Sequence, residues 1–103
     1  MLVVRRSFLT RTWQERPLAD VAKQWLDVVR EQISPDLTYR IYVFHTGPAN
    51  TVEVELEVES LQEWEELWES MLHNADVGEL MPQTTELSEP GGACEIWFLH
   101  AQA

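Results

Sequence analysis

Alternation of apolar and polar residues predicts four strands. Residues 2–11 are rich in β-branched side chains, residues 38–45 combine aromatic, β-branched and polar residues, and residues 93–100 form a last short run. In residues 51–59 the alternation is strict, with an apolar set and an acidic set: Val52, Val54, Leu56 and Val58, and Glu53, Glu55, Glu57 and Glu59. Because successive side chains of a strand point to opposite faces, this strand has one buried face and one charged face.

Two further segments repeat apolar residues with helical spacing. The first starts at Pro17, a residue suited to the first turn of a helix, and stops at Ser34-Pro35-Asp36. The second follows a capping box formed by Ser60 and Glu63. We expect residues 76–87 to add only a short irregular helical segment, because Pro82 breaks its middle.

The order β-α-β-β-α-β predicts an α+β fold of the ferredoxin-like kind, with a four-stranded antiparallel sheet and helices on one face. At 103 residues, of which 45% are hydrophobic, we expect one domain over residues 1–103. The longest apolar run is only residues 41–44, and no apolar segment follows the N-terminal arginines. Neither a membrane span nor a secretion signal is therefore expected.

The sheet face away from the helices, called the open face below, is predicted from the hairpin register. A four-residue loop over residues 47–50 would place Arg40 opposite Glu57 and Tyr42 opposite Glu55. A shift by one residue would turn the buried face toward solvent. We predict that the open face contributes the ligand-binding residues, which are Arg5, Ser7, Arg40, Tyr42, Glu55, Glu57 and Trp97.

Large apolar side chains also fall on the open face. Leu9, Phe44 and Leu99 are predicted there, beside Tyr42 and Trp97. A fully solvated sheet face has little reason to keep such residues. We therefore predict a homodimer formed through the open face.

The strong negative charge of the chain argues against anionic partners. The chain has 7 basic and 18 acidic residues and a net charge of −11, and all the basic residues precede residue 41. Such a field repels phosphate backbones and anionic lipids, so neither nucleic acid nor a membrane is expected as a partner.

The lone cysteine and the histidines give little chemistry. Cys94 has no partner for an intrachain disulfide, so a cytoplasmic location is expected. No Lys or Arg lies near it in the sequence, and we interpret it as a small buried hydrophobic residue of the last strand. His45, His73 and His100 show no metal-ligand spacing, so no metal site is expected.

Several segments together resemble a known family. They are Tyr39-Arg40-Ile41-Tyr42, Thr46-Gly47-Pro48, Ser60-Leu61-Gln62-Glu63-Trp64, Glu89-Pro90-Gly91-Gly92 and Glu95-Ile96-Trp97. In this order they resemble the dimeric α/β-barrel superfamily, nearest its NIPSNAP-like members, over nearly the whole chain. The resemblance implies a homodimer whose two sheets face each other as a barrel. A small-molecule ligand would lie between sheet and helices or between the two sheets.

The resemblance also implies an alternative, a cofactor-independent monooxygenase-like enzyme acting on an aromatic substrate. Haem-degrading members use an Asn on the first strand, a Trp on the second helix and an axial His. Here Ser7, Trp64 and His73 stand near those positions. Ser7 departs from the pattern and the acidic second half would repel haem propionates, so no cofactor is expected and no catalytic residue is assigned. A purely structural module stays open.

The interior distinguishes these hypotheses. An enclosed aromatic cavity that holds a polar group favours the enzyme, whereas a filled interior favours a scaffold. Three tryptophans, Trp25, Trp64 and Trp68, lie on the apolar stripes of the two helices, and we interpret them as core packing.

Overall fold

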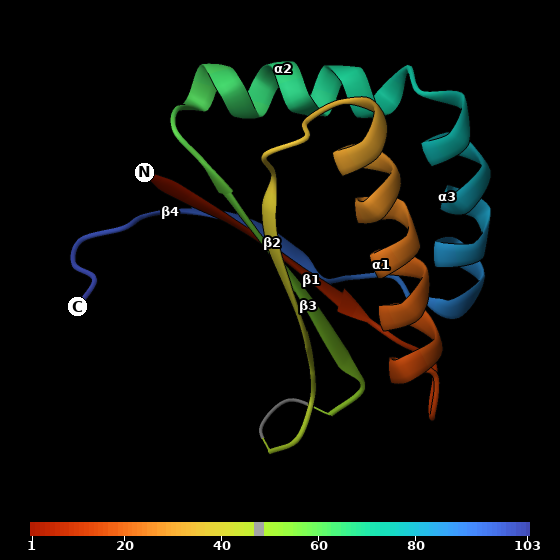
Figure 1. The fold of residues 1–103 in the computed structure, drawn as a ribbon. Helices are drawn as coiled ribbons and strands as arrows, with labels where there is room; N and C mark the ends of the chain where they lie inside the picture. The colour runs from red at the N-terminus through yellow and green to blue at the C-terminus, as the bar shows by residue number, and fades with distance from the viewer. Residues whose placement is uncertain (47–48) are drawn as a thin grey trace.

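The computed structural model describes residues 1–46 and 49–103 and shows a four-stranded antiparallel sheet with helices on one face (Figure 1). The strands lie in the order β2-β3-β1-β4. This is the ferredoxin-like arrangement predicted from the sequence, with one additional helix, α3. The elements are β1 (Leu2–Leu9), α1 (Glu15–Gln32), β2 (Thr38–Val43), β3 (Thr51–Val58), α2 (Leu61–Leu72), α3 (Ala75–Leu87) and β4 (Ala93–Phe98).

The helix ends follow their local sequence. α1 begins at Glu15, two residues before the predicted start, and Pro17 lies in its first turn, where a missing N–H costs no helical hydrogen bond. At the start of α2 the Ser60 hydroxyl accepts a 3.1 Å hydrogen bond from the Glu63 N–H. The Glu63 carboxylate accepts a 2.7 Å bond from the backbone N–H of Glu59. The predicted capping residues therefore begin α2 as expected.

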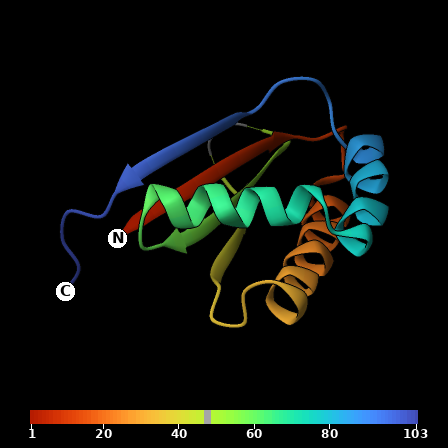
Figure 2. The same cartoon turned by 90° about the horizontal axis from the view of Figure 1, so that it is seen from above.

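α3 continues through Pro82, so the predicted break in this segment is wrong. The ring of a helical proline crowds the carbonyl four residues earlier, which here belongs to Gly78, a residue without a side chain. The helix also has a good start, because the Asn74 side chain accepts a 3.0 Å hydrogen bond from Val77 N–H. In both ribbon views α3 lies beside α1 (Figures 1 and 2).

The core lies between the sheet and α1. Every second residue of β3 is buried there, as the strict alternation predicted, and Val52 is fully covered. Leu18, Leu26 and Val29 of α1 are also fully buried. All six residues of β4 are exposed, so the helices leave this edge strand bare. No helix among the described residues is long and apolar enough to cross a membrane.

The register of the β2–β3 hairpin differs from the prediction by two residues. Arg40 lies opposite Glu55, and Tyr42 lies opposite Glu53. The cause is a longer connection, because Phe44 N–H still bonds to the Thr51 carbonyl at 3.2 Å. A shift of two residues keeps every side chain on its predicted face. Gly47 and Pro48, half of the predicted loop, lie outside the described residues.

Candidate functional site

The seven residues predicted to bind a ligand all lie on the open face. Paired strand positions form rows across the sheet, and one row consists of Arg40, Glu55, Arg5 and Glu95. The next row contains Tyr42, Glu53 and Ser7, and the row on the other side contains Glu57 and Trp97, which flank Val3. The alternation of the strands therefore located this face correctly.

The charged groups of the open face bind one another. Arg5 pairs with Glu53 at 2.8 Å and Arg40 pairs with Glu57 at 2.9 Å. The Arg40–Glu57 contact runs diagonally across the hairpin, so the predicted pair forms although the register differs.

Tyr42 completes this set of contacts, since its hydroxyl donates a 2.8 Å hydrogen bond to the Glu55 carboxylate. That bond is the main cause that raises the pKa of Tyr42, because it favours the neutral phenol. Most polar groups of the predicted ligand set are therefore already occupied within the sheet, and their role in ligand binding stays a prediction.

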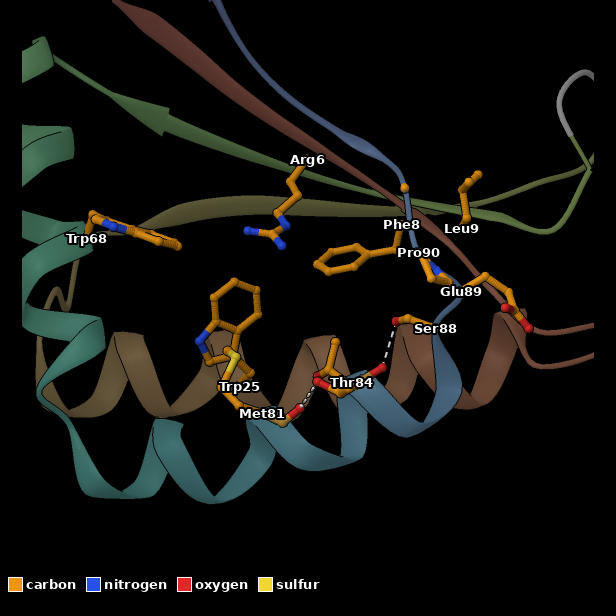
Figure 3. Close-up of a pocket in the computed structure, with 12 residues that line it drawn as sticks. Arg6, Phe8, Leu9, Trp25, Trp68, Met81, Thr84, Ser88, Glu89 and Pro90 are labelled. Atoms are coloured by element: carbon orange, nitrogen blue, oxygen red, sulfur yellow. Dashed lines mark hydrogen bonds between the residues drawn. The ribbon is translucent and has the colours of Figure 1, made fainter.

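A cavity lies on the other face, between the sheet and the helices. It consists of two adjoining pockets of about 330 Å³ and about 250 Å³, which share Arg6, Trp25 and Trp68. We call the two together the helix-side cavity. Its size is within the range of small-molecule sites. Figure 3 shows the Arg6 side chain extending from β1 toward the helices, with Trp68 on one side, Phe8 on the other and Trp25 facing it.

Arg6 is the charged group of the helix-side cavity. Its guanidinium carbon lies 4.9 Å from the centre of the Phe8 ring, a cation–π contact. Within residues 1–46 and 49–103 no carboxylate lies within ion-pair distance of Arg6. Nearby, the buried indole N–H of Trp25 also has no hydrogen-bond partner among the described residues. The cavity thus offers one cation between aromatic rings.

Arg6 is not among the residues predicted from the sequence to bind a ligand, although a signal for it is present. Alternation places Arg6 between Val4 and Phe8 on the apolar face of β1, where a charged residue is out of place. The interpretation of the three tryptophans as core packing is correct only in part. Trp25 is buried in the core, and Trp64 packs against that core. Trp68 is 37% exposed and lines the helix-side cavity.

Cys94 lies directly opposite Arg6 and lines the helix-side cavity. It is exposed, so its interpretation as a buried hydrophobic residue is wrong. The reason is the bare edge strand, since no helix covers β4 where the alternation alone suggested a buried position. The antiparallel pairing also brings an arginine beside this thiol, which its sequence neighbours did not indicate.

The residues compared with the haem-degrading pattern are not brought together. Ser7 lies on the open face, whereas Trp64 lines the helix-side cavity. His73 ends α2 with its side chain exposed, and its ring nitrogen lies 2.8 Å from the Glu69 carboxylate. No group of three or more metal-ligating side chains occurs in the part of the chain that the structure describes.

Comparison with known proteins gives a likeness in structure alone. No protein-family model and no curated protein matches the sequence. An uncharacterised NIPSNAP domain protein from Burkholderia xenovorans superposes with a TM-score of 0.82 at 11% identity, over 100% of this chain and 98% of that one. A NIPSNAP family protein from Agrobacterium tumefaciens superposes with a TM-score of 0.81 at 15% identity, over 99% of this chain and 88% of that one. The fold is NIPSNAP-like.

A second kind of neighbour is more distant. A structure described as an antibiotic biosynthesis monooxygenase gives a TM-score of 0.70 at 12% identity, over 98% of this chain and all of that one. The NIPSNAP-like fold predicted from the sequence is thus confirmed, and the monooxygenase-type fold is a weaker match. At these identities the likeness concerns the fold and assigns no chemistry to the residues.

Proposed function

We propose that this NIPSNAP-like protein is a homodimer that binds a small molecule in the helix-side cavity. The observation that carries the proposal is the cavity itself, which places Arg6 between Trp25 and Trp68. A concave site with aromatic walls and a few polar groups is the usual form of a ligand site. A filled interior would instead have favoured a purely structural module.

The dimer would form through the open face. Tyr42 and Trp97 are 46% and 52% exposed there, and Leu9, Phe44 and Leu99 are also exposed. A second copy of the same face would cover these side chains, and the residues predicted from the sequence would line the interface between the two sheets. We propose a cytoplasmic location as well, which the unpaired thiol of Cys94 supports.

Native mass spectrometry tests both parts of this proposal. At micromolar protein concentration we expect a species of twice the 12.0 kDa chain mass, with a small molecule that denaturation releases. Cys94→Trp would fill the cavity from an exposed position, and Cys94→Ser is the matched control. The Trp variant should lose the small molecule and the Ser variant should keep it. A monomeric species contradicts the dimer, and a ligand retained by Cys94→Trp contradicts the site.

The alternative function is a cofactor-independent monooxygenase-like enzyme for an aromatic substrate. The monooxygenase-type structural neighbour and the aromatic cavity with a polar group favour it. A naphthohydroquinone probe with an oxygen electrode tests it. If the protein is such an enzyme, oxygen uptake should exceed the spontaneous rate with the wild type and with Cys94→Ser. With Cys94→Trp it should fall to the spontaneous rate. Uptake equal to the spontaneous rate contradicts this alternative and leaves the binding function.

A further inference from the structure

We infer that the ligand of the helix-side cavity is a planar organic anion, such as an aromatic carboxylate, whose negative group binds Arg6. This inference rests on the proposed function, because it names the ligand class of the same cavity. Two features carry it: the unpaired charge of Arg6 and the aromatic walls.

Arg6, Arg16 and Arg30 have no carboxylate within ion-pair distance among the described residues, and of these three only Arg6 lines the helix-side cavity. With 18 acidic and 7 basic residues, carboxylates are abundant, and Arg5, Arg11, Lys23 and Arg40 each have one as a partner. Arg6 has none among the described residues and lies on the apolar face of β1 instead. A guanidinium in this position presents a planar fork of donors, which matches the two oxygens of a carboxylate.

The neighbouring polar groups give Arg6 no ionic partner among the described residues. The Trp25 indole N–H has no acceptor among the described residues, but the atom is fully covered and so is not accessible from the cavity. The hydroxyls along α3 use their own protons on helix carbonyls, since Ser88 donates to the Thr84 carbonyl at 2.6 Å. The carboxylate at the outer end of the cavity, Glu89, lies 3.8 Å from Arg11. The α3 hydroxyl oxygens are left as acceptors, so the donors that remain free for an anion in the cavity are those of the Arg6 guanidinium.

The aromatic walls indicate the shape of the rest of the ligand, beyond its negative group. Phe8 and Trp25 are buried beside Arg6, and the partly exposed Trp68 lies across the cavity from Phe8 (Figure 3). Trp68 is itself held by Trp64, with ring centres 5.7 Å apart. Flat aromatic side chains favour a flat partner, because stacking and edge contacts both depend on ring geometry.

Two matched dyes test the charge directly. Anilinonaphthalenesulfonate is an aromatic anion, and N-phenyl-naphthylamine has the same rings without the sulfonate. Both fluoresce when they enter an apolar cavity. We expect Arg6→Gln to weaken binding of the anionic dye by about tenfold or more and to change binding of the neutral dye by less than about twofold. Arg16→Gln, an exposed position on α1 with the same change in net charge, should affect neither dye.

Alkylation of Cys94 locates the bound dye. Cys94 is the chain's one cysteine and lines the cavity, so anilinonaphthalenesulfonate should slow its reaction with iodoacetamide in the wild type and not in Arg6→Gln. Naphthoate should displace the dye at lower concentration than decanoate, an aliphatic carboxylate. Equal displacement by the two acids would overturn the planar part of the inference.

The outcomes separate this inference from the function on which it rests. If neither dye protects Cys94, the cavity does not bind small molecules and the proposed function fails. If the neutral dye binds and protects Cys94 while Arg6→Gln leaves the anionic dye unchanged, the cavity binds ligands and only the anionic class is wrong. Circular dichroism of Arg6→Gln checks that the variant is folded before either comparison.

Discussion

Arg5 and Arg6 are neighbours in β1, yet they lie on opposite faces of the sheet and differ in whether a carboxylate pairs with them. On the open face, Arg5 belongs to a row of alternating charges and pairs at 2.8 Å with Glu53 of the next row. On the helix side, Arg6 has no carboxylate partner among the described residues and contacts the ring of Phe8. The chain therefore neutralises one arginine internally and leaves the other available to a ligand.

This difference shows what each face is suited to do. Charges that satisfy one another, as on the open face, allow a polar surface to be covered by a second copy without leaving isolated ions. A single cation beside aromatic rings does the reverse, because Arg6 is exposed and has no carboxylate partner among the described residues, so its charge stays available to an anion. The open face is thus suited to association and the helix-side cavity to ligand binding.

The largest effect should come from truncating the buried side of β3. Val52 is fully buried, so Val52→Ala should lower the free energy of unfolding by about 2 kcal/mol through lost burial and a residual cavity. Glu53→Gln, one residue away on the open face, should cost less than about 1 kcal/mol, because its ion pair with Arg5 is partly exposed. Urea unfolding at one fixed protein concentration measures both. Equal losses would contradict the assignment of the two faces.

A smaller effect with opposite signs is expected at the two arginines. Arg5→Leu should destabilise the protein by about 1 kcal/mol, since it leaves Glu53 without its partner. Arg6→Leu should instead stabilise it by about 0.5 kcal/mol, because an apolar side chain beside Val4 and Phe8 suits that face. The same variant should lose binding of the anionic dye. If Arg6→Leu were as destabilising as Arg5→Leu, Arg6 would be a structural residue with a partner of its own.

Local signals predicted most of the fold. The alternation in β3 and the Ser60 capping box depend on residues close together in the chain, and both are confirmed. The two-residue shift of the hairpin depends on the turn, whose geometry the strand pattern does not determine. The helix through Pro82 forms where α3 packs against α1, a tertiary contact that the local sequence does not show.

The candidate site was harder to predict than the fold. Its walls come from β1, α1, α2 and α3, so no sequence window contains it. The exposure of Cys94 and its position opposite Arg6 follow from the strand order and from helices that leave β4 bare, which are tertiary facts. The one local sign was a charged residue on an apolar face at Arg6.

The smallest expected effect concerns the contact between Tyr39 and Asp27. Tyr39 is a polar residue on the helix face of the sheet that, unlike Arg6, has a partner. The Tyr39 hydroxyl donates a 2.7 Å hydrogen bond to Asp27 of α1, and Lys23 donates another at 2.6 Å. The Lys23 bond first, and then the Tyr39 bond, hold the pKa of Asp27 below its ordinary 3.8. A lowered pKa means that the folded protein favours the ionised carboxylate.

Asp27→Asn should therefore destabilise the protein by about 0.5 kcal/mol near neutral pH, a small value because Asp27 and Lys23 are both substantially exposed. The ionised Asp27 stabilises the fold at every pH above its unfolded pKa, and this contribution is lost as the pH falls through the lower folded pKa. Thermal unfolding of wild type and variant between about pH 7 and about pH 3 should show a difference that is constant at first and shrinks progressively once the pH falls below about 4. Asp20→Asn, an exposed aspartate of the same helix without an ion pair among the described residues, should show no such difference. A gap between wild type and Asp27→Asn that persisted into acid would mean that the link between α1 and β2 depends on packing of the Tyr39 ring rather than on the charge of Asp27.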